Sequence, residues 1–145
     1  MNILVPVDGS KCSLEGLKVA RDYAKTKDAN IYLINVTPYI EFVDLEISAS
    51  EREKLTQSME KRSDDIVNQA CKMLSAQDVI ATCKTVTASV SVPDAIIDFA
   101  EKEKINLIII GSRGLGTSKK FRLGSIAAKV VRHSHCGVYV VKEPC

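Results

Sequence analysis

The chain has 145 residues, of which 46% are hydrophobic and 26% are charged, and its formal net charge is +2. This length and composition fit one globular domain, so we expect a single domain over residues 1–145. The small net charge argues against a nucleic-acid-binding protein, the apolar runs are too short for a membrane span, and we expect no secretory signal at the start.

Short runs rich in Ile and Val predict five β-strands. Most of these runs are continuous rather than alternating, which is typical of strands that are covered on both faces of a sheet. In chain order they are Ile3–Val7, Ile31–Val36, Ile80–Val86, Leu107–Ile110 and Val138–Val141.

The segments between these runs have the spacing of four helices. Ser10 is a candidate cap for the first, the capping-box pattern Ser50-Glu51-Arg52-Glu53 predicts the start of the second, Pro93 lies near the start of the third, and Ser125 starts the fourth. Apolar residues at helical period mark the buried faces. They are Leu14, Leu17 and Ala24; Leu55, Met59, Ile66, Ala70 and Met73 or Leu74; Ile96, Phe99 and Ala100; Ile126 and Val130.

Strands that alternate with helices predict an α/β fold: a parallel sheet between two helical layers, joined by right-handed crossovers. Five strands favour the flavodoxin-like order 3-2-1-4-5. Ligands of such sheets bind beyond the carboxyl ends of the strands, at the switch point between the first and fourth strands. We therefore expect Pro6–Ser10 and the segment that starts at Gly111 to flank one crevice.

The stretch from Gly111 to Ser125 follows a buried strand and is rich in glycine, basic and hydroxyl residues. Such a stretch before a helix is typical of phosphate binding, because glycine backbone and a helix N-terminus both favour an anion. It is not a P-loop, since Thr117 stands where the lysine belongs. It is not a dinucleotide fingerprint either, since Lys119 replaces the third glycine.

The spacing Gly111-x2-Gly114-x9-Gly124-Ser125, together with Pro6-Val7-Asp8-Gly9-Ser10 and Pro93–Ile97, resembles the ATP-binding branch of the universal stress protein family. The resemblance covers essentially the whole chain. It implies a five-stranded sheet sandwiched by four helices and a cytoplasmic, homodimeric protein. The dimer would form through the edge strand Val138–Lys142, unless Glu143–Cys145 shields that edge.

The resemblance also implies a site for ATP, with Mg²⁺ or Mn²⁺ able to bridge the phosphates. Asp8 would lie at the ribose, Val7 and Val36 at the adenine, and the two glycines of the loop would allow close approach. Arg113 and the helix start would bind phosphate. The full set is Pro6, Val7, Asp8, Val36, Ile110, Gly111, Arg113, Gly114, Gly124, Ser125 and Ile126.

Several alternatives stay open at this point. Asp8 would serve equally as a cap of the first helix. The bases Lys119, Lys120 and Arg122 either add charge near phosphate or are solvated loop residues. The long stretch Pro38–Ser48 is a flap, a partner contact or a loop that packs on its own domain.

The sequence offers little for catalysis. Asp8 is the one carboxylate that the pattern brings into the crevice, and Asp44 and Glu46 would approach it only if the long loop folds over. We expect no catalytic or metal-ligating residue, slow hydrolysis at most, and a nucleotide that acts as a regulatory ligand. The alternative is a nucleotide-free module that binds a protein partner. A receiver domain is disfavoured because Thr85–Ala88 lacks an Asp, and a flavin carrier because its phosphate loop follows the first strand.

The five cysteines are odd in number and include no C-x-x-C pair. This pattern favours reduced thiols in a cytoplasmic protein over a disulfide framework. We expect no zinc site, since His133, His135 and Cys136 cluster without a second group of ligands.

Overall fold

The computed structural model describes residues 1–38, 46–113 and 123–142. All strand pairs are parallel and the sheet order is β3-β2-β1-β4-β5, which confirms the predicted fold class and strand order. The elements are β1 (Asn2–Pro6), α1 (Lys11–Lys27), β2 (Asn30–Thr37), α2 (Ala49–Ser75), β3 (Ala81–Thr87), α3 (Val92–Lys102), β4 (Leu107–Gly111), α4 (Ser125–His133) and β5 (Gly137–Val141).

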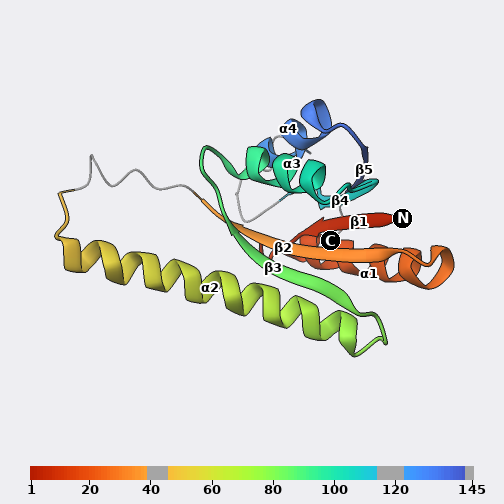
Figure 1. The fold of residues 1–145 in the computed structure, drawn as a ribbon, viewed down its shortest axis with the longest axis horizontal. Helices are drawn as coiled ribbons and strands as arrows, with labels where there is room; N and C mark the ends of the chain where they lie inside the picture. Colours follow the sequence, from red (N-terminus) through yellow and green to blue (C-terminus); the bar gives the residue numbers. More distant parts are fainter. Residues whose placement is uncertain (39–45, 114–122, 143–145) are drawn as a thin grey trace.

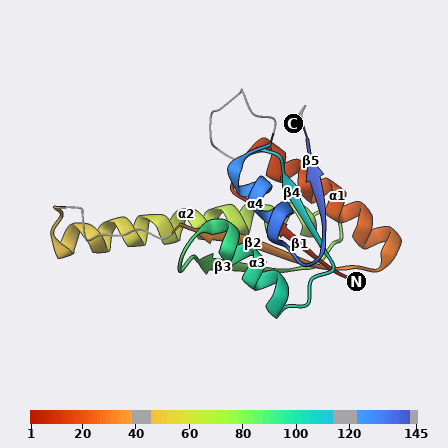
Figure 2. The same ribbon diagram turned by 90° about the horizontal axis from the view of Figure 1, so that it is seen from above.

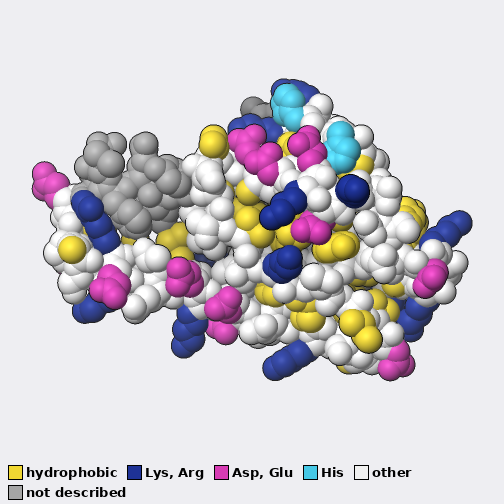
Figure 3. Space-filling view, in the orientation of Figure 1, with side chains coloured by type: hydrophobic (Ala, Val, Ile, Leu, Met, Phe, Trp, Pro, Cys, Tyr) yellow, Lys and Arg dark blue, Asp and Glu magenta, His cyan; other side chains and the backbone are white. Residues whose placement is uncertain are grey.

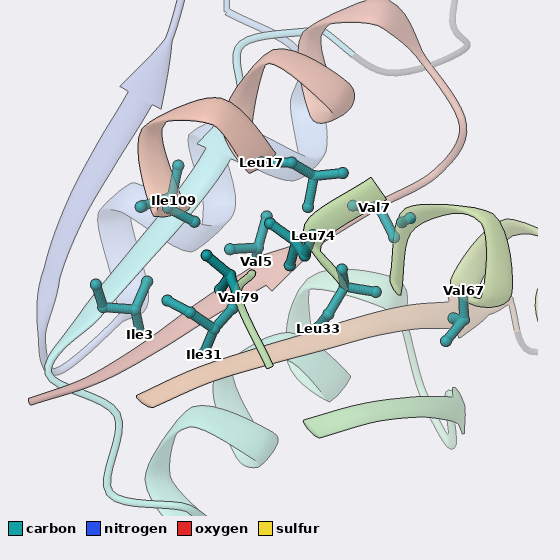
Figure 4. Close-up of a cluster of buried hydrophobic side chains, with 12 residues drawn as sticks. Ile3, Val5, Val7, Leu17, Ile31, Leu33, Val67, Leu74, Val79 and Ile109 are labelled. Atoms are coloured by element: carbon teal, nitrogen blue, oxygen red, sulfur yellow. The ribbon is translucent and has the colours of Figure 1, made fainter. Parts of the chain in front are cut away.

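Helices cover both faces of the sheet, with α1 and α2 on one side and α3 and α4 on the other (Figures 1 and 2). Successive residues of a strand point to opposite faces, so one strand supplies both cores. In β1, Ile3 and Val5 enter the core beneath α1 and α2, which Figure 4 shows, whereas Leu4 enters the core beneath α3 and α4. The central strands are therefore apolar on both faces along most of their length, as the continuous runs predicted.

Helix α2 packs on the sheet only through its C-terminal half. Its buried residues are Ser63, Val67, Ala70 and Leu74, which recur at helical spacing, and no residue before Ser63 is buried. The N-terminal half projects beyond the strands in Figures 1 and 2, and Figure 3 shows charged side chains along it. The predicted apolar stripe thus starts too early, since Leu55 is 37% exposed.

The start of α2 lies two residues before the predicted one. Ser48 is the N-cap: its Oγ accepts from the Glu51 N–H at 3.2 Å, and the Glu51 carboxylate accepts from the Ser48 N–H at 3.1 Å. Ser50, which the sequence pattern favoured as the cap, lies inside the first turn. Both serines stand three residues before a Glu, so the pattern alone did not distinguish them.

Strand β3 forms an edge of the sheet and is covered less than its sequence suggested. It pairs with β2, and its burial alternates along most of its length instead of being continuous. Ile80, which we predicted as its first residue, is 93% exposed and lies outside the strand. The polar residues Thr82, Lys84 and Thr85 of this segment are all exposed, as expected of an edge strand with one face open to solvent.

The prediction of reduced thiols is wrong for three of the described cysteines, since Cys12, Cys71 and Cys83 are disulfide-bonded. Cys71 in α2 and Cys83 in β3 form a disulfide, with their Cα atoms 6.4 Å apart. Their separation of 12 residues hides the contact in the sequence, and the turn after α2 brings them together. Cys136 is a free thiol, and burial raises its pKa.

Within the described residues, no helix has both the length and the apolar composition required to cross a bilayer.

Candidate functional site

A cavity of about 810 Å³ opens at the carboxyl ends of β1, β2 and β4, the position that the switch-point rule predicts. Its walls come from both helical layers, with α2 on one side and α3 and α4 on the other. Ten of the predicted site residues line it: Pro6, Val7, Asp8, Val36, Ile110, Gly111, Arg113, Gly124, Ser125 and Ile126.

Some predicted positions lie outside the described residues. These are Gly114, the bases Lys119, Lys120 and Arg122, and Asp44 in the long connection. Of that connection, Pro38 lines the cavity and Ser48 caps α2. Glu46 is exposed and is not among the lining residues.

The turn after β1 fixes the orientation of Asp8. Its Oδ1 accepts from the Ser10 N–H at 2.8 Å, and this hydrogen bond forms an Asx turn across Gly9. The backbone φ of Gly9 is +86°, a value that residues with a side chain rarely adopt. The cap of α1 is Ser10, whose Oγ accepts from the Ser13 N–H at 3.3 Å. Asp8 therefore shapes the turn without capping the helix, and its Oδ2 has no hydrogen-bond partner among the described residues.

Gly111 is required by packing at the end of β4. A Cβ built there would lie 2.8 Å from Cys12 Cβ, 2.9 Å from Cys12 C and 3.0 Å from Ser13 N, all in the first turn of α1. The sequence assigned this glycine to close approach of a ligand. The close approach that the structure records is instead between β4 and α1, and it brings the turns after β1 and β4 together.

Helix α4 begins at the cavity without a side-chain cap. Its N-cap is Gly124, whose own N–H donates to the Ser112 carbonyl at 2.6 Å. The first-turn N–H groups of a helix lack partners within the helix, and they carry the positive end of its dipole. Ser125, Ile126 and Ala127 make up this first turn and all line the cavity, so α4 presents donors to whatever fills it.

Ser112 is a lining residue that we did not predict. Its backbone is fully engaged, since the N–H donates to the Val141 carbonyl at 2.8 Å and the carbonyl accepts from Gly124. Its side chain is only 1% exposed, and its Oγ has no partner among the described residues. Buried hydroxyls are nearly always hydrogen-bonded, so this one indicates a missing partner in the cavity.

A second unpredicted group joins α2 to the sheet. The Ser63 Oγ–H donates to Asn35 Oδ1 at 2.7 Å, and Asn35 Nδ2 donates to the Val7 carbonyl at 2.6 Å. Asn35 and Ser63 are 8% and 3% exposed, and both line the cavity. The sequence did hold one signal, a polar residue within the apolar run Ile31–Val36, whereas nothing local connects Ser63 to the sheet.

The remaining lining residues that we did not predict are mostly apolar residues from α2 and from the side of α3 and α4, together with two hydroxyl residues and one arginine. They are Ser13, Thr37, Met59, Arg62, Ile66, Val92, Ile96 and Leu123. Among the described lining residues Asp8 is the one acid, and Arg62 and Arg113 are cations, so the charge of the walls suits an anionic ligand. Within the described part of the chain, no three His, Cys, Asp or Glu side chains cluster as metal ligands do.

Comparison with known proteins gives a consistent family. The model of the Usp family, described as "Universal stress protein family", matches residues 1–142. A universal stress protein of Methanocaldococcus jannaschii is 34% identical over 143 residues, which cover 98% of this chain and 82% of that protein. Universal stress protein UspA from Lactobacillus plantarum has a TM-score of 0.79 at 22% identity, with 97% of each chain covered.

Two further solved structures of similar fold carry nucleotides. One is a universal stress protein from Archaeoglobus fulgidus in complex with dAMP, with a TM-score of 0.69, 20% identity and 98% of each chain covered. The other is a universal stress protein family protein from Arabidopsis thaliana with AMP bound, with a TM-score of 0.69 at 18% identity, covering 97% of this chain and 90% of that one. The family model and the relative together show that this chain belongs to the universal stress protein family.

Proposed function

We propose that this protein binds an adenine nucleotide, ATP, as a regulatory ligand. The observation that carries the proposal is the orphan hydroxyl of Ser112, buried in the cavity beside the uncapped N-terminus of α4. The two features offer hydrogen-bond donors that no group among the described residues uses, and a helix N-terminus favours phosphate. The dAMP and AMP complexes of the similar structures support a nucleotide as that group.

The rest of the cavity suits the parts of a nucleotide. The open carboxylate oxygen of Asp8 can accept from ribose hydroxyls, and Arg113 lies on the side of the cavity that α4 borders. Val7 and Val36 offer apolar contact to a base. A volume of about 810 Å³ falls within the range of small-molecule pockets.

We propose slow hydrolysis at most. Phosphoryl transfer needs a positioned base or water and usually a metal held by acidic residues. Asp8 is the single acid among the described lining residues, and its Oδ1 is already engaged in the turn. Mg²⁺ or Mn²⁺ would then depend mainly on phosphate oxygens and water for its ligands.

The direct test is to denature the purified protein, identify any released nucleotide, and titrate the emptied protein with ATP, AMP and GTP by calorimetry. We expect a released adenine nucleotide or measurable heat with ATP. Absence of both would refute the proposal and favour the nucleotide-free module.

A variant of Asp8 sharpens this test. Asp8→Asn keeps an oxygen for the Ser10 N–H but loses the charge offered to the ribose, so nucleotide affinity should fall about ten-fold, the value of a hydrogen bond to a charged group. Asp98→Asn, at an exposed position of α3, is the matched control and should bind as the wild type does.

We also propose a homodimer in the cytoplasm. In the described sheet β5 is an outer strand that pairs with β4, and Tyr139 on it is 42% exposed. Sedimentation should give twice the chain mass, and Tyr139→Lys should lower it, whereas Thr82→Lys on the opposite edge strand should not. A monomer at high micromolar concentration would contradict the dimer. The cytoplasmic location loses one of its original arguments, since Cys71 and Cys83 are paired.

A further inference from the structure

Helix α2 supplies one wall of the cavity, and its position depends on contacts that lie farther along the helix. Met59, Ser63 and Ile66 line the cavity, whereas the half of the helix before Ser63 has no buried residue. The row of buried residues that packs on the sheet runs from Ser63 to Leu74. The wall is therefore held in place from one end of the helix, by the segment that ends at Leu74.

The disulfide between Cys71 and Cys83 lies in this anchoring segment. Cys71 stands just over two turns beyond Ser63, which is about 12 Å along the helix. Cys83 belongs to β3, which pairs with β2, and β2 carries Asn35 and Val36 at the cavity. The disulfide thus ties the helix that forms the wall to the half of the sheet that ends at the cavity.

This disulfide is open to a reductant from solvent. Both of its cysteines are half-buried, whereas Cys12 is buried, and the neighbouring residues Lys72, Thr82 and Lys84 are exposed. Within the described sheet β3 is an outer strand, so one of its edges faces outward. Disulfides of cytoplasmic proteins are usually transient and act in catalysis or redox sensing, and the cytoplasmic location proposed above puts this one in that class.

We propose that Cys71 and Cys83 form a redox-active site whose oxidation state controls nucleotide affinity, an inference that rests on the proposed nucleotide binding. The reductant is a dithiol. One of its thiolates attacks a sulfur of the pair and forms a mixed disulfide, and the other cysteine leaves and takes up a proton. The second thiol of the reductant then attacks the mixed disulfide and releases the remaining cysteine. Two electrons and two protons pass to the cysteines, and the reductant becomes a disulfide.

Reduction weakens the attachment of α2 to the sheet. The hydrogen bond from Ser63 to Asn35 and the buried side chains of the helix remain, but the covalent link to β3 is lost. The cross-link limits the conformations of the chain when the helix detaches, so its loss favours the detached form. A ligand that contacts the α2 wall binds the attached form better, and reduction therefore lowers its affinity. By linkage, the bound ligand opposes reduction by the same factor.

The first experiment compares the oxidised and the dithiothreitol-reduced full chain by calorimetry with ATP. The oxidised form should bind at least about five-fold more tightly, the lower end of typical couplings between sites. Alkylation and mass spectrometry measure the reduced fraction of the pair in dithiothreitol redox buffers, and saturating ATP should shift this equilibrium toward the disulfide by the same factor. Equal affinities of the two forms would overturn the redox control while leaving nucleotide binding intact. No binding by either form would refute both.

Variants then separate this disulfide from the other cysteines. Cys71→Ser/Cys83→Ser should bind ATP as the reduced wild type does, and it should lose most of the response to dithiothreitol, although the disulfide of Cys12 remains. Cys136→Ser, which removes a free thiol, is the matched control and should keep the full response. A double variant with the full response would place the control elsewhere. A reduced wild type that melts at a lower temperature but binds ATP unchanged would show a purely structural disulfide. Either result would overturn the inference.

Discussion

Gly111→Ala tests whether packing alone requires glycine at the end of β4. The added Cβ would lie 2.8 Å from Cys12 Cβ and 2.9 Å from Cys12 C. Carbon atoms in contact normally stay about 3.5 Å apart or more, so the overlap is roughly 0.7 Å. Two of the three nearest atoms belong to the backbone of α1, and no rotamer change can relieve them.

Overpacking of this kind costs about 1–3 kcal/mol, and backbone neighbours favour the upper half of that range. Alanine also restricts the unfolded chain more than glycine does, which stabilises the folded state by about 0.4–1 kcal/mol. The free energy of unfolding should therefore fall by about 2 kcal/mol in net. For a chain of 145 residues this corresponds to a fall in Tm of about 6 °C. Nucleotide-free protein is melted by differential scanning calorimetry, so that lost binding cannot mimic lost stability.

Gly16→Ala is the control, since Gly16 faces β4 from the same helix. Its Cβ would meet Ile109 Cγ2 at 3.5 Å, an ordinary contact, and alanine favours a helix interior by about 0.5–1 kcal/mol. This variant should melt at or above the wild-type temperature. A Gly111→Ala variant as stable as the wild type would refute the packing argument. It would favour the earlier interpretation, that glycine is needed at position 111 for close approach of a ligand.

Three other measurements follow from the described contacts. Ser112→Ala should raise the Tm of the nucleotide-free protein, because an unpaired buried hydroxyl destabilises the fold by about 1–3 kcal/mol. The same variant should weaken nucleotide binding. A lower Tm would mean that the hydroxyl is already paired. Ser48→Ala should speed amide exchange in the first turns of α2 with little change in Tm, since that half of the helix is not packed, whereas Ser50→Ala should do neither. Mass spectrometry of a non-reduced digest should link the peptides of Cys71 and Cys83, and separate peptides would contradict the disulfide.

The sequence predicted the sheet well because burial there is periodic and local. The runs through Leu4, Ile34 and Ile108 are continuous since two helical layers cover the central strands, and the alternation of strands and helices allowed few topologies. The errors fall where context outweighs local pattern. Ile80 is apolar but precedes an edge strand, and Ser50 matches the capping box that Ser48 forms.

For the cavity too, the sequence predicted the parts that depend on local pattern and missed those that depend on contacts between distant segments. Each of the turns after β1 and β4 is one short segment of the sequence, and the switch-point rule brings the two turns, with Asp8 and Gly124, to one crevice without any knowledge of contacts. The wall that α2 supplies depends on where a helix of 27 residues first meets the sheet, which is at Ser63. That point also carries the buried hydrogen bond from Ser63 to Asn35, which joins residues that are 28 positions apart in the sequence.

The hydrogen bonds around the cavity separate its structural polar groups from those left for a ligand. Ser10 and Ser13 satisfy each other and the first turn of α1, so their hydroxyls hold the loop in shape. Ser112 Oγ and one oxygen of Asp8 have no such use among the described residues, although Asp8 is tied to the turn through its other oxygen. Residue type does not separate these groups, since serine occurs in both. The two kinds of serine differ in whether the hydroxyl has a hydrogen-bond partner among the described residues. By this criterion Ser112, which the family resemblance had left out, is the most informative residue of the site.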